Sequence, residues 1–174
     1  MKISIYKIII FIFVIFFLFV FWRALKINNN YDTKSLIGEK ISNFKLTKID
    51  TDNQYISEED LKKNSFTLIN FFASWCAPCR AEHVYLLNLS SKNPEIKIIG
   101  INFKDKKINA INFLKELGDP YNFVGKDVEG KISILFGIYG IPESILIDND
   151  LTIIKKIVGP IDQIHYNEIL KLIK

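Results

Sequence analysis

The sequence is poor in the residues that form covalent or metal cross-links. Only two of its 174 residues are cysteine and two are histidine. Two cysteines can close one disulfide, but they cannot build a scaffold held by several bridges. His83 and His165 show no spacing typical of metal ligands, so half of any zinc site would be missing. The sequence therefore predicts no metal site and no cofactor.

Arginine is equally scarce, since Arg23 and Arg80 are the only two. Lysines supply the other basic residues and are interleaved with acidic residues, for a formal net charge of +4. A nucleic-acid-binding domain needs its basic residues concentrated on one face. The mixed pattern instead predicts a solvated surface and no nucleic-acid partner. Hydrophobic residues make up 49% of the chain, which is enough for a packed core.

One long apolar run lies near the N-terminus. Residues 8–22 read IIIFIFVIFFLFVFW, and residues 3–7 extend the run to roughly the 20 residues that a helix needs to cross a bilayer. Such a helix would be apolar on every face, unlike an amphipathic helix of a soluble core. Trp22 and Arg23 suit the boundary between membrane and water. The run therefore predicts a transmembrane helix.

A cleaved signal peptide is the alternative for this run. Lys2 and Lys7 would form its charged front, but cleavage needs small residues where Trp22-Arg23 stand. We therefore expect an uncleaved signal-anchor. The positive charges on its two sides are nearly balanced, so the run alone does not fix its orientation.

Downstream, apolar strand-like runs alternate with helix-like segments. The chain is expected to divide into an anchor over residues 1–24, a linker over 25–35 and a folded domain over 36–174. The alternation predicts an α/β fold with helices around a central sheet, and a closing hairpin makes that sheet mixed. The expected strands are 43–49, 66–73, 96–103, 121–125, 144–148 and 152–158, and the expected helices are a turn from Ser57, 77–91, 107–117, 130–136 and 161–173.

Both cysteines fall in one motif, Trp75-Cys76-Ala77-Pro78-Cys79, between a buried strand and a helix. Cys76 would lie at the helix N-terminus, where unpaired N–H groups and the helix dipole favour a thiolate. Its thiolate can attack a partner disulfide, and Cys79 can then resolve the mixed disulfide. The motif thus predicts a thiol–disulfide oxidoreductase. A static disulfide and a copper(I) site remain the alternatives.

Four segments resemble one known family. They are residues 75–83 (WCAPCRAEH), 100–105 (GINFKD), 113–121 (FLKELGDPY) and 137–144 (GIYGIPES). The first is typical of thioredoxin-like proteins in general. The last is similar to the fingerprint of the cytochrome c maturation thiol–disulfide oxidoreductases of the CcmG/DsbE type, with Ser144 where threonine is usual. The resemblance covers nearly all of residues 36–174, and it implies a thioredoxin-like fold.

The resemblance also implies a place and a task. Such proteins are anchored in the inner membrane by a single pass, with the thioredoxin-like domain in the periplasm. They keep the haem-binding cysteines of apocytochrome c reduced, directly or through a partner thiol protein. A membrane reductase of the DsbD/CcdA type supplies the electrons. An anchored reductant of the TlpA/ResA type, for example for copper-site assembly, is the competing function, and a non-catalytic binding or copper(I) module is a third.

Several residues beside the cysteines take roles from the same resemblance. Thioredoxin-fold proteins place a cis-proline beside the disulfide, which implies that Pro142, with Ile141 before it and Trp75, binds the substrate peptide. Glu82 and Glu143 are expected to tune the thiol pKa values and to move protons, because Asn70 stands where thioredoxins carry a buried aspartate. The candidate catalytic residues are therefore Cys76, Cys79, Glu82 and Glu143. His83 is expected on the helix surface, and Tyr139 beside the peptide groove.

Overall fold

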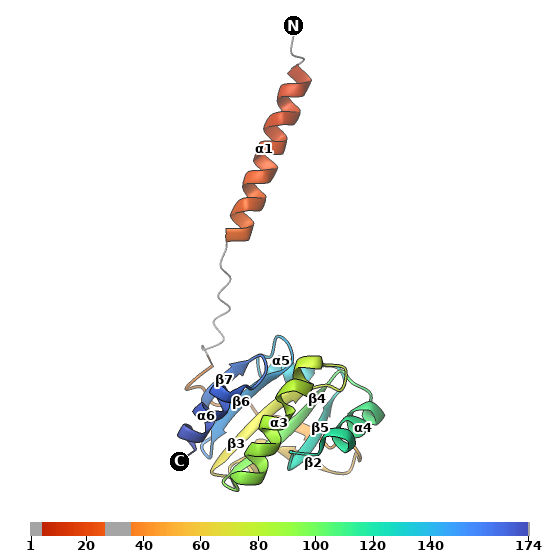
Figure 1. Ribbon diagram of the computed structural model, residues 1–174, viewed down its shortest axis with the longest axis vertical. Coiled ribbons are helices and arrows are strands. Elements are labelled where there is room, and N and C mark those ends of the chain that lie inside the picture. The colour runs from red at the N-terminus through yellow and green to blue at the C-terminus, as the bar shows by residue number, and fades with distance from the viewer. Residues whose placement is uncertain (1–4, 27–35, 174) are drawn as a thin grey trace. The chain divides into compact units, whose positions relative to one another are not determined.

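The computed structural model describes residues 5–26 and 36–173, which belong to two separate units, an N-terminal helix and a C-terminal domain (Figure 1). The first unit is α1 (Ile5–Lys26). Its segment Ile5–Arg23 has a mean hydropathy of 2.8, and none of it is buried. That length and composition are sufficient to cross a membrane. Most of the predicted linker, from residue 27 to 35, lies outside the described residues.

The second unit is built on a five-stranded mixed sheet with the strand order β5-β4-β3-β6-β7. β3 pairs in parallel with β4, and β4 with β5, whereas β3–β6 and β6–β7 are antiparallel. The central position of β3 explains its near-continuous apolar sequence, because both of its faces are covered. The strands are β3 (Phe66–Phe72), β4 (Ile96–Phe103), β5 (Phe123–Asp127), β6 (Glu143–Asp148) and β7 (Ile153–Val158).

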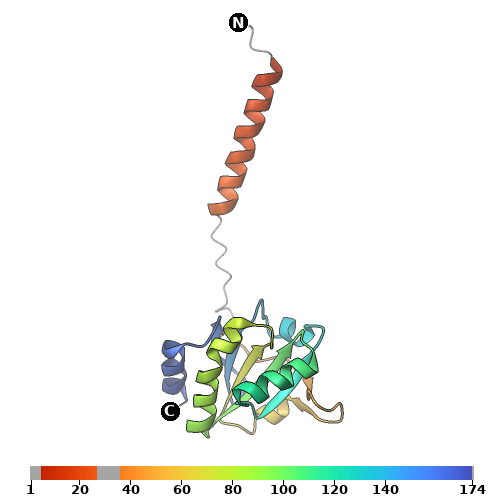
Figure 2. The same ribbon diagram turned by 45° about the vertical axis from the view of Figure 1, so that its right-hand side comes forward.

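Three helices cover one face of this sheet. α3 (Ala77–Lys92) joins β3 to β4, and α4 (Lys107–Leu117) joins β4 to β5. Both crossovers proceed in the same direction across the sheet, so right-handed connections place both helices on the same face, as Figure 2 shows. α6 (Gln163–Leu172) packs beside α3 on that face.

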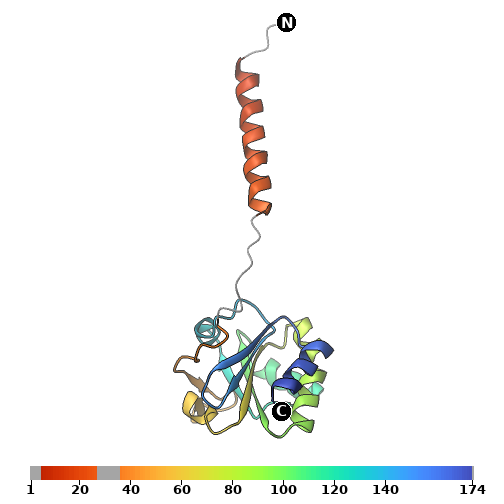
Figure 3. The ribbon, with the colours of Figure 1, turned by 90° about the vertical axis from the view of Figure 1, so that its left-hand side faces the viewer.

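The opposite face is covered by shorter elements, which Figure 3 shows with the sheet between them and the α3–α6 pair. They are α2 (Glu58–Leu61), α5 (Lys131–Leu135) and the segment around β1 (Lys45–Thr47). β1 pairs with β2 (Tyr55–Ser57) in a separate antiparallel sheet. The strand predicted over 43–49 is therefore shorter, and β2 is an element that the sequence analysis did not predict.

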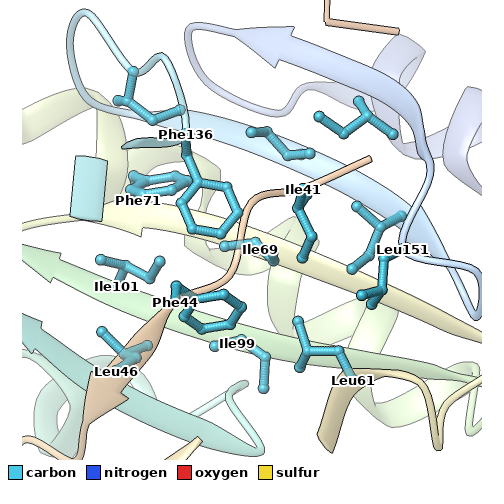
Figure 4. Packing of buried hydrophobic residues seen from close by; sticks show 14 residues of the cluster. Ile41, Phe44, Leu46, Leu61, Ile69, Phe71, Ile99, Ile101, Phe136 and Leu151 are labelled. Atoms are coloured by element: carbon cyan, nitrogen blue, oxygen red, sulfur yellow. The ribbon is translucent and has the colours of Figure 1, made fainter. Parts of the chain in front are cut away.

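The alternation of β3 side chains divides the core in two. Ile69 and Phe71 face the short elements, where Phe44 and Phe136 pack edge to face at a centroid distance of 5.3 Å (Figure 4). Leu68 faces α3 and α6. Asn70 lies on the same face as Leu68, because alternate residues of a strand share a face. It is fully buried, so the sheet carries an amide in the middle of its α3 face.

Candidate active site

The two cysteines form a disulfide at the start of α3. Cys76 is the N-cap residue, and its Cα lies 5.3 Å from that of Cys79. The Cys79 N–H donates to Cys76 Sγ at 3.1 Å. In the reduced protein, this N–H and the helix dipole would stabilise a thiolate on Cys76. The predicted position of the motif, at a junction between strand and helix, is confirmed.

A cis peptide bond lies in the loop that precedes β6. The Ile141–Pro142 bond is cis, as the resemblance implied. Ile141 is half-buried and packs against the hydrophobic cluster that contains Cys76 and Cys79. The structure therefore brings residues 65 positions apart in the sequence to one site.

The loop before Cys76 is fastened to the loop that follows β4. Asp105 Oδ2 accepts from the Ser74 N–H at 2.7 Å and from the Asn102 amide at 3.2 Å. Trp75 Nε1 donates to the Lys104 carbonyl at 3.3 Å, while 59% of the Trp75 surface stays exposed. These contacts hold an aromatic side chain at the surface directly before Cys76, next to a pocket of about 430 Å³ lined by Trp75, Lys104, Asp105, Lys106, Asn109 and Val128.

Glu82 lies one helical turn after Cys79 and is fully buried. Its Oε1 accepts from the Asn70 amide at 2.8 Å, and its Oε2 accepts from the Ile161 N–H at 2.7 Å. Burial disfavours the charged form and raises the pKa of Glu82 to about 7, although both hydrogen bonds act in the opposite direction. A carboxyl group with this pKa can take up and release a proton near neutral pH.

Glu143 is buried as well, but it faces a counter-charge. Its Oε1 accepts from the N–H groups of Tyr139 and Gly140, both at 3.0 Å. The Lys156 ammonium lies 3.2 Å from Oε2 as an ion pair, and it donates a hydrogen bond to the Gly137 carbonyl at 2.6 Å. Both charged side chains are nearly inaccessible, with exposed fractions of 1% and 2%. Glu143 and Lys156 thus fasten the loop that leads to Pro142.

The prediction for His83 is wrong, because its side chain is buried. Nε2 lies 2.8 Å from the Gly118 carbonyl, and the ring packs nearly perpendicular to that of Phe113. Burial lowers the pKa of His83 and favours its neutral form. His165 lies near the surface, where its backbone N–H donates to the side chain of Asp162, the N-cap residue of α6.

Comparison with known proteins places this site in a family. The model of the Redoxin family matches residues 36–170, which is most of the chain. The chain belongs to the Redoxin family. Within that family, relatives named thiol:disulfide interchange protein DsbE confirm the resemblance to thiol–disulfide oxidoreductases of the DsbE type.

Two curated relatives and one solved structure carry matching names. This redoxin is 50% identical over 106 residues to the thiol:disulfide interchange protein CycY of Rhizobium leguminosarum bv. viciae, which is 61% of this chain but only 56% of that relative. It is 36% identical to a thiol:disulfide interchange protein DsbE of Pseudomonas aeruginosa over 91% of this chain and 85% of the relative. A crystal structure described as thiol:disulfide interchange protein DsbE from Chlorobium tepidum superimposes with a TM-score of 0.69 at 25% identity, covering 79% of this chain and 98% of that one. The predicted thioredoxin-like fold is confirmed.

Two residues of the site in this redoxin were missed by the sequence analysis. Lys156 stands in the strand sequence IIKKIV, where a lysine normally indicates an exposed position. The Tyr121 hydroxyl donates to Asn70 Oδ1 at 2.7 Å, and the residues next to Tyr121 in the sequence do not predict that contact. Tyr121 does end one of the four resembling segments, which was the available signal.

Proposed function

We propose that this redoxin is a membrane-anchored thiol–disulfide oxidoreductase that acts as a reductant in cytochrome c maturation. The observation that carries the proposal is the Cys76–Cys79 disulfide at the N-terminus of α3, packed against the segment with cis-Pro142. Relatives named thiol:disulfide interchange proteins support the reaction type. The resemblance of residues 137–144 to the family fingerprint supports the pathway.

In the proposed reaction, the Cys76 thiolate attacks one sulfur of a partner disulfide and expels one partner thiolate. Cys79 then attacks Cys76 Sγ and expels the second partner thiolate. Two electrons pass to the partner, and a disulfide forms between Cys76 and Cys79. A donor dithiol returns two electrons to it. The proposed partner is apocytochrome c or a dedicated thiol protein of cytochrome c maturation, and the proposed donor is a membrane reductase of the DsbD/CcdA type.

The proposed location follows from α1 and from the chemistry. Residues 1–24 would anchor the chain in the inner membrane, residues 25–35 would link, and residues 36–174 would fold in the periplasm. The apolar surface of α1 supports the anchor, because its side chains are exposed at no cost in lipid, where the helix also satisfies its own backbone hydrogen bonds. A disulfide-handling domain suits an oxidising compartment, where disulfides persist.

The side chains around the disulfide take proposed roles from their contacts. Trp75 and the backbone of Ile141 beside Pro142 would bind the partner peptide on either side of Cys76. Glu82 would accept the Cys79 proton, which its pKa near 7 supports. Glu143 would contribute negative charge near the thiols and would position the loop of residues 137–140, because it accepts hydrogen bonds from the N–H groups of Tyr139 and Gly140.

A trapping experiment tests the function. In the Cys79→Ser variant, the mixed disulfide on Cys76 cannot be resolved, so the partner is expected to stay covalently attached. We would express the anchored variant in its own host and identify the attached proteins by mass spectrometry. The Cys76→Ser/Cys79→Ser double variant is the control and should capture nothing.

The identity of the captured proteins decides between the candidate functions. Apocytochrome c or its thiol partner supports the proposal. A broad mixture, or proteins of copper-site assembly, would favour a reductant of the TlpA/ResA type instead. No adduct, together with no exchange on a model disulfide, would contradict turnover and favour a binding or copper(I) module.

A further inference from the structure

Gly100 and Tyr121 belong to two of the resembling segments and have no role in the proposed reaction, and they meet on the α3 face of the sheet. Gly100 of β4 lies directly beside Asn70 of β3 in the parallel register, and Ser144 of β6 lies beside Asn70 on its other side. Tyr121, which precedes β5, reaches over this row. Residues from three places in the sequence thus surround one buried amide.

The Tyr121 ring occupies space that only glycine leaves free. It stacks on Phe72 at a centroid distance of 4.9 Å. A Cβ on Gly100 would come within 2.9 Å of Tyr121 Cγ, which is closer than Cβ atoms approach other atoms, and within 3.0 Å of Phe72 Cε1, which is unusually tight. Gly100 therefore allows the ring to lie across β4, with its hydroxyl group at Asn70.

Each hydrogen-bonding group of the Asn70 side chain has a partner. Oδ1 accepts from the Tyr121 hydroxyl at 2.7 Å. Nδ2 donates one hydrogen to Glu82 Oε1 at 2.8 Å and one to Ser144 Oγ at 3.0 Å. An amide has two chemically different ends, and the partners of both ends agree on one orientation. In that orientation the NH₂ group faces the carboxylate.

We propose that Tyr121 is a positioning residue that holds the Asn70 amide with its NH₂ group toward Glu82, and so keeps Glu82 able to accept a proton. A protonated Glu82 could donate to Oδ1 if the amide turned over. The Tyr121 hydroxyl occupies Oδ1 and opposes that turn. This inference rests on the proposed function in one respect, namely that Glu82 serves the thiols.

Other charged groups act on the members of this cluster. The charge of Asp119 favours a higher pKa for both Tyr121 and His83, and the charge of Arg80 favours a lower pKa for His83. Desolvation of the ring and then the negative charge of Glu82 raise the pKa of Tyr121, so the hydroxyl stays protonated and remains a donor. The Asn70 hydrogen bond lowers the pKa of Glu82 against the effect of burial. Loss of that bond should therefore shift the Glu82 titration upward.

The test is Tyr121→Phe in the full chain in detergent micelles. With Glu side chains labelled with ¹³C at the carboxyl carbon, NMR follows the Glu82 titration in the oxidised protein, where the cysteines do not titrate. The signal is assigned by its loss in Glu82→Gln. A hydrogen bond to a charged group corresponds to a shift of about one pH unit, so the midpoint should rise by about that amount. Exchange with a model disulfide at pH 7 should fall about fivefold, in line with the smaller ionised fraction.

Two further variants serve as a control and as a second test of the same contact. Tyr166→Phe removes the hydroxyl of a half-buried tyrosine that packs against the Leu68 cluster on the same face, and its Glu82 midpoint should match that of the unaltered protein. Gly100→Ala should displace the Tyr121 ring and raise the midpoint in the same direction, which keeps the test available if Tyr121→Phe does not fold.

An unchanged midpoint in Tyr121→Phe, or an equal rise in Tyr166→Phe, would overturn the proposal. Failure of the proposed function has a different signature, because the unaltered protein would then show no exchange at any pH. The NMR titration would still decide whether Tyr121 positions the amide.

Discussion

Glu82 and Glu143 are two buried carboxylates in the two segments that meet at the disulfide, and they are satisfied in different ways. Glu82 accepts hydrogen bonds from a neutral amide and a backbone N–H, and no cation among the residues that the structure describes pairs with it. Glu143 accepts hydrogen bonds from two backbone N–H groups and forms an ion pair with the Lys156 ammonium. Burial is therefore common to both, and the counter-charge distinguishes them. The comparison indicates that one carboxylate is suited to exchanging protons and the other to holding a loop.

Removal of the counter-charge is expected to have the largest effect. Lys156→Met leaves Glu143 buried without its cation, and breaking a buried pair in this way costs about 3–5 kcal/mol in the free energy of unfolding. Denaturant titration of the full chain in detergent measures that loss. In Lys156→Met/Glu143→Gln no charge remains, so part of the stability should return. A loss below about 1 kcal/mol in the single variant would mean that the loop N–H groups alone satisfy Glu143.

The pH dependence of stability tests the other carboxylate. The pKa of Glu82 is about 7 in the folded protein, against an ordinary value of 4.5. Since folding raises this pKa, the contribution of Glu82 is complete below pH 4.5 and is lost as the pH rises through 7. The shift corresponds to about 3 kcal/mol. Unfolding free energies measured between pH 5 and 8 should fall in the unaltered protein and should fall much less in Glu82→Gln.

His83 acts in the opposite direction in this experiment. Its lowered pKa means that stability is lost as the pH falls below its ordinary value of 6.5. Glu82→Gln retains His83, so the difference between the two curves isolates Glu82. Parallel curves would contradict the assigned titration of Glu82.

The smallest effect is expected at the lysine next to Lys156. Lys155 Nζ lies 2.8 Å from Glu168, but the two side chains are 22% and 44% exposed. Pairs that water reaches contribute little, so Lys155→Met should cost less than about 1 kcal/mol, and added salt should reduce the difference further. The same denaturant titration provides the measurement. A cost equal to that of Lys156→Met would show that burial does not separate these neighbouring lysines.

Most of the fold could be predicted from the sequence, because its central strands are long apolar runs and its helices end at clear signals. β3 and β4 were expected within one residue of where they lie. β2 was missed since Tyr55–Ser57 forms only three residue pairs, with β1, and none of them is fully buried on the β2 side. An element this short leaves almost no periodic pattern.

The cysteines and Pro142 could be predicted because their neighbours in the sequence identify them. The surroundings of His83 and Lys156 could not. The hydrogen-bond partner of the His83 ring is the Gly118 carbonyl after α4, 35 positions away. The partners of Lys156 are Glu143 and the Gly137 carbonyl, 13 and 19 positions before it. Such partners depend on how distant segments pack, and a single sequence contains no local signal for them.

The depth of the disulfide has a kinetic consequence. Cys79 is 1% exposed and Cys76 is 4% exposed, with Cys76 at the N-cap of α3 and Cys79 inside its first turn. In the proposed cycle, electron donor and electron acceptor must therefore both react at Cys76, and each excludes the other while it is attached. We expect ping-pong kinetics, with parallel lines in double-reciprocal plots of initial rate at several fixed donor concentrations. An excess of either partner should then inhibit turnover by occupying the form of the protein that awaits the other.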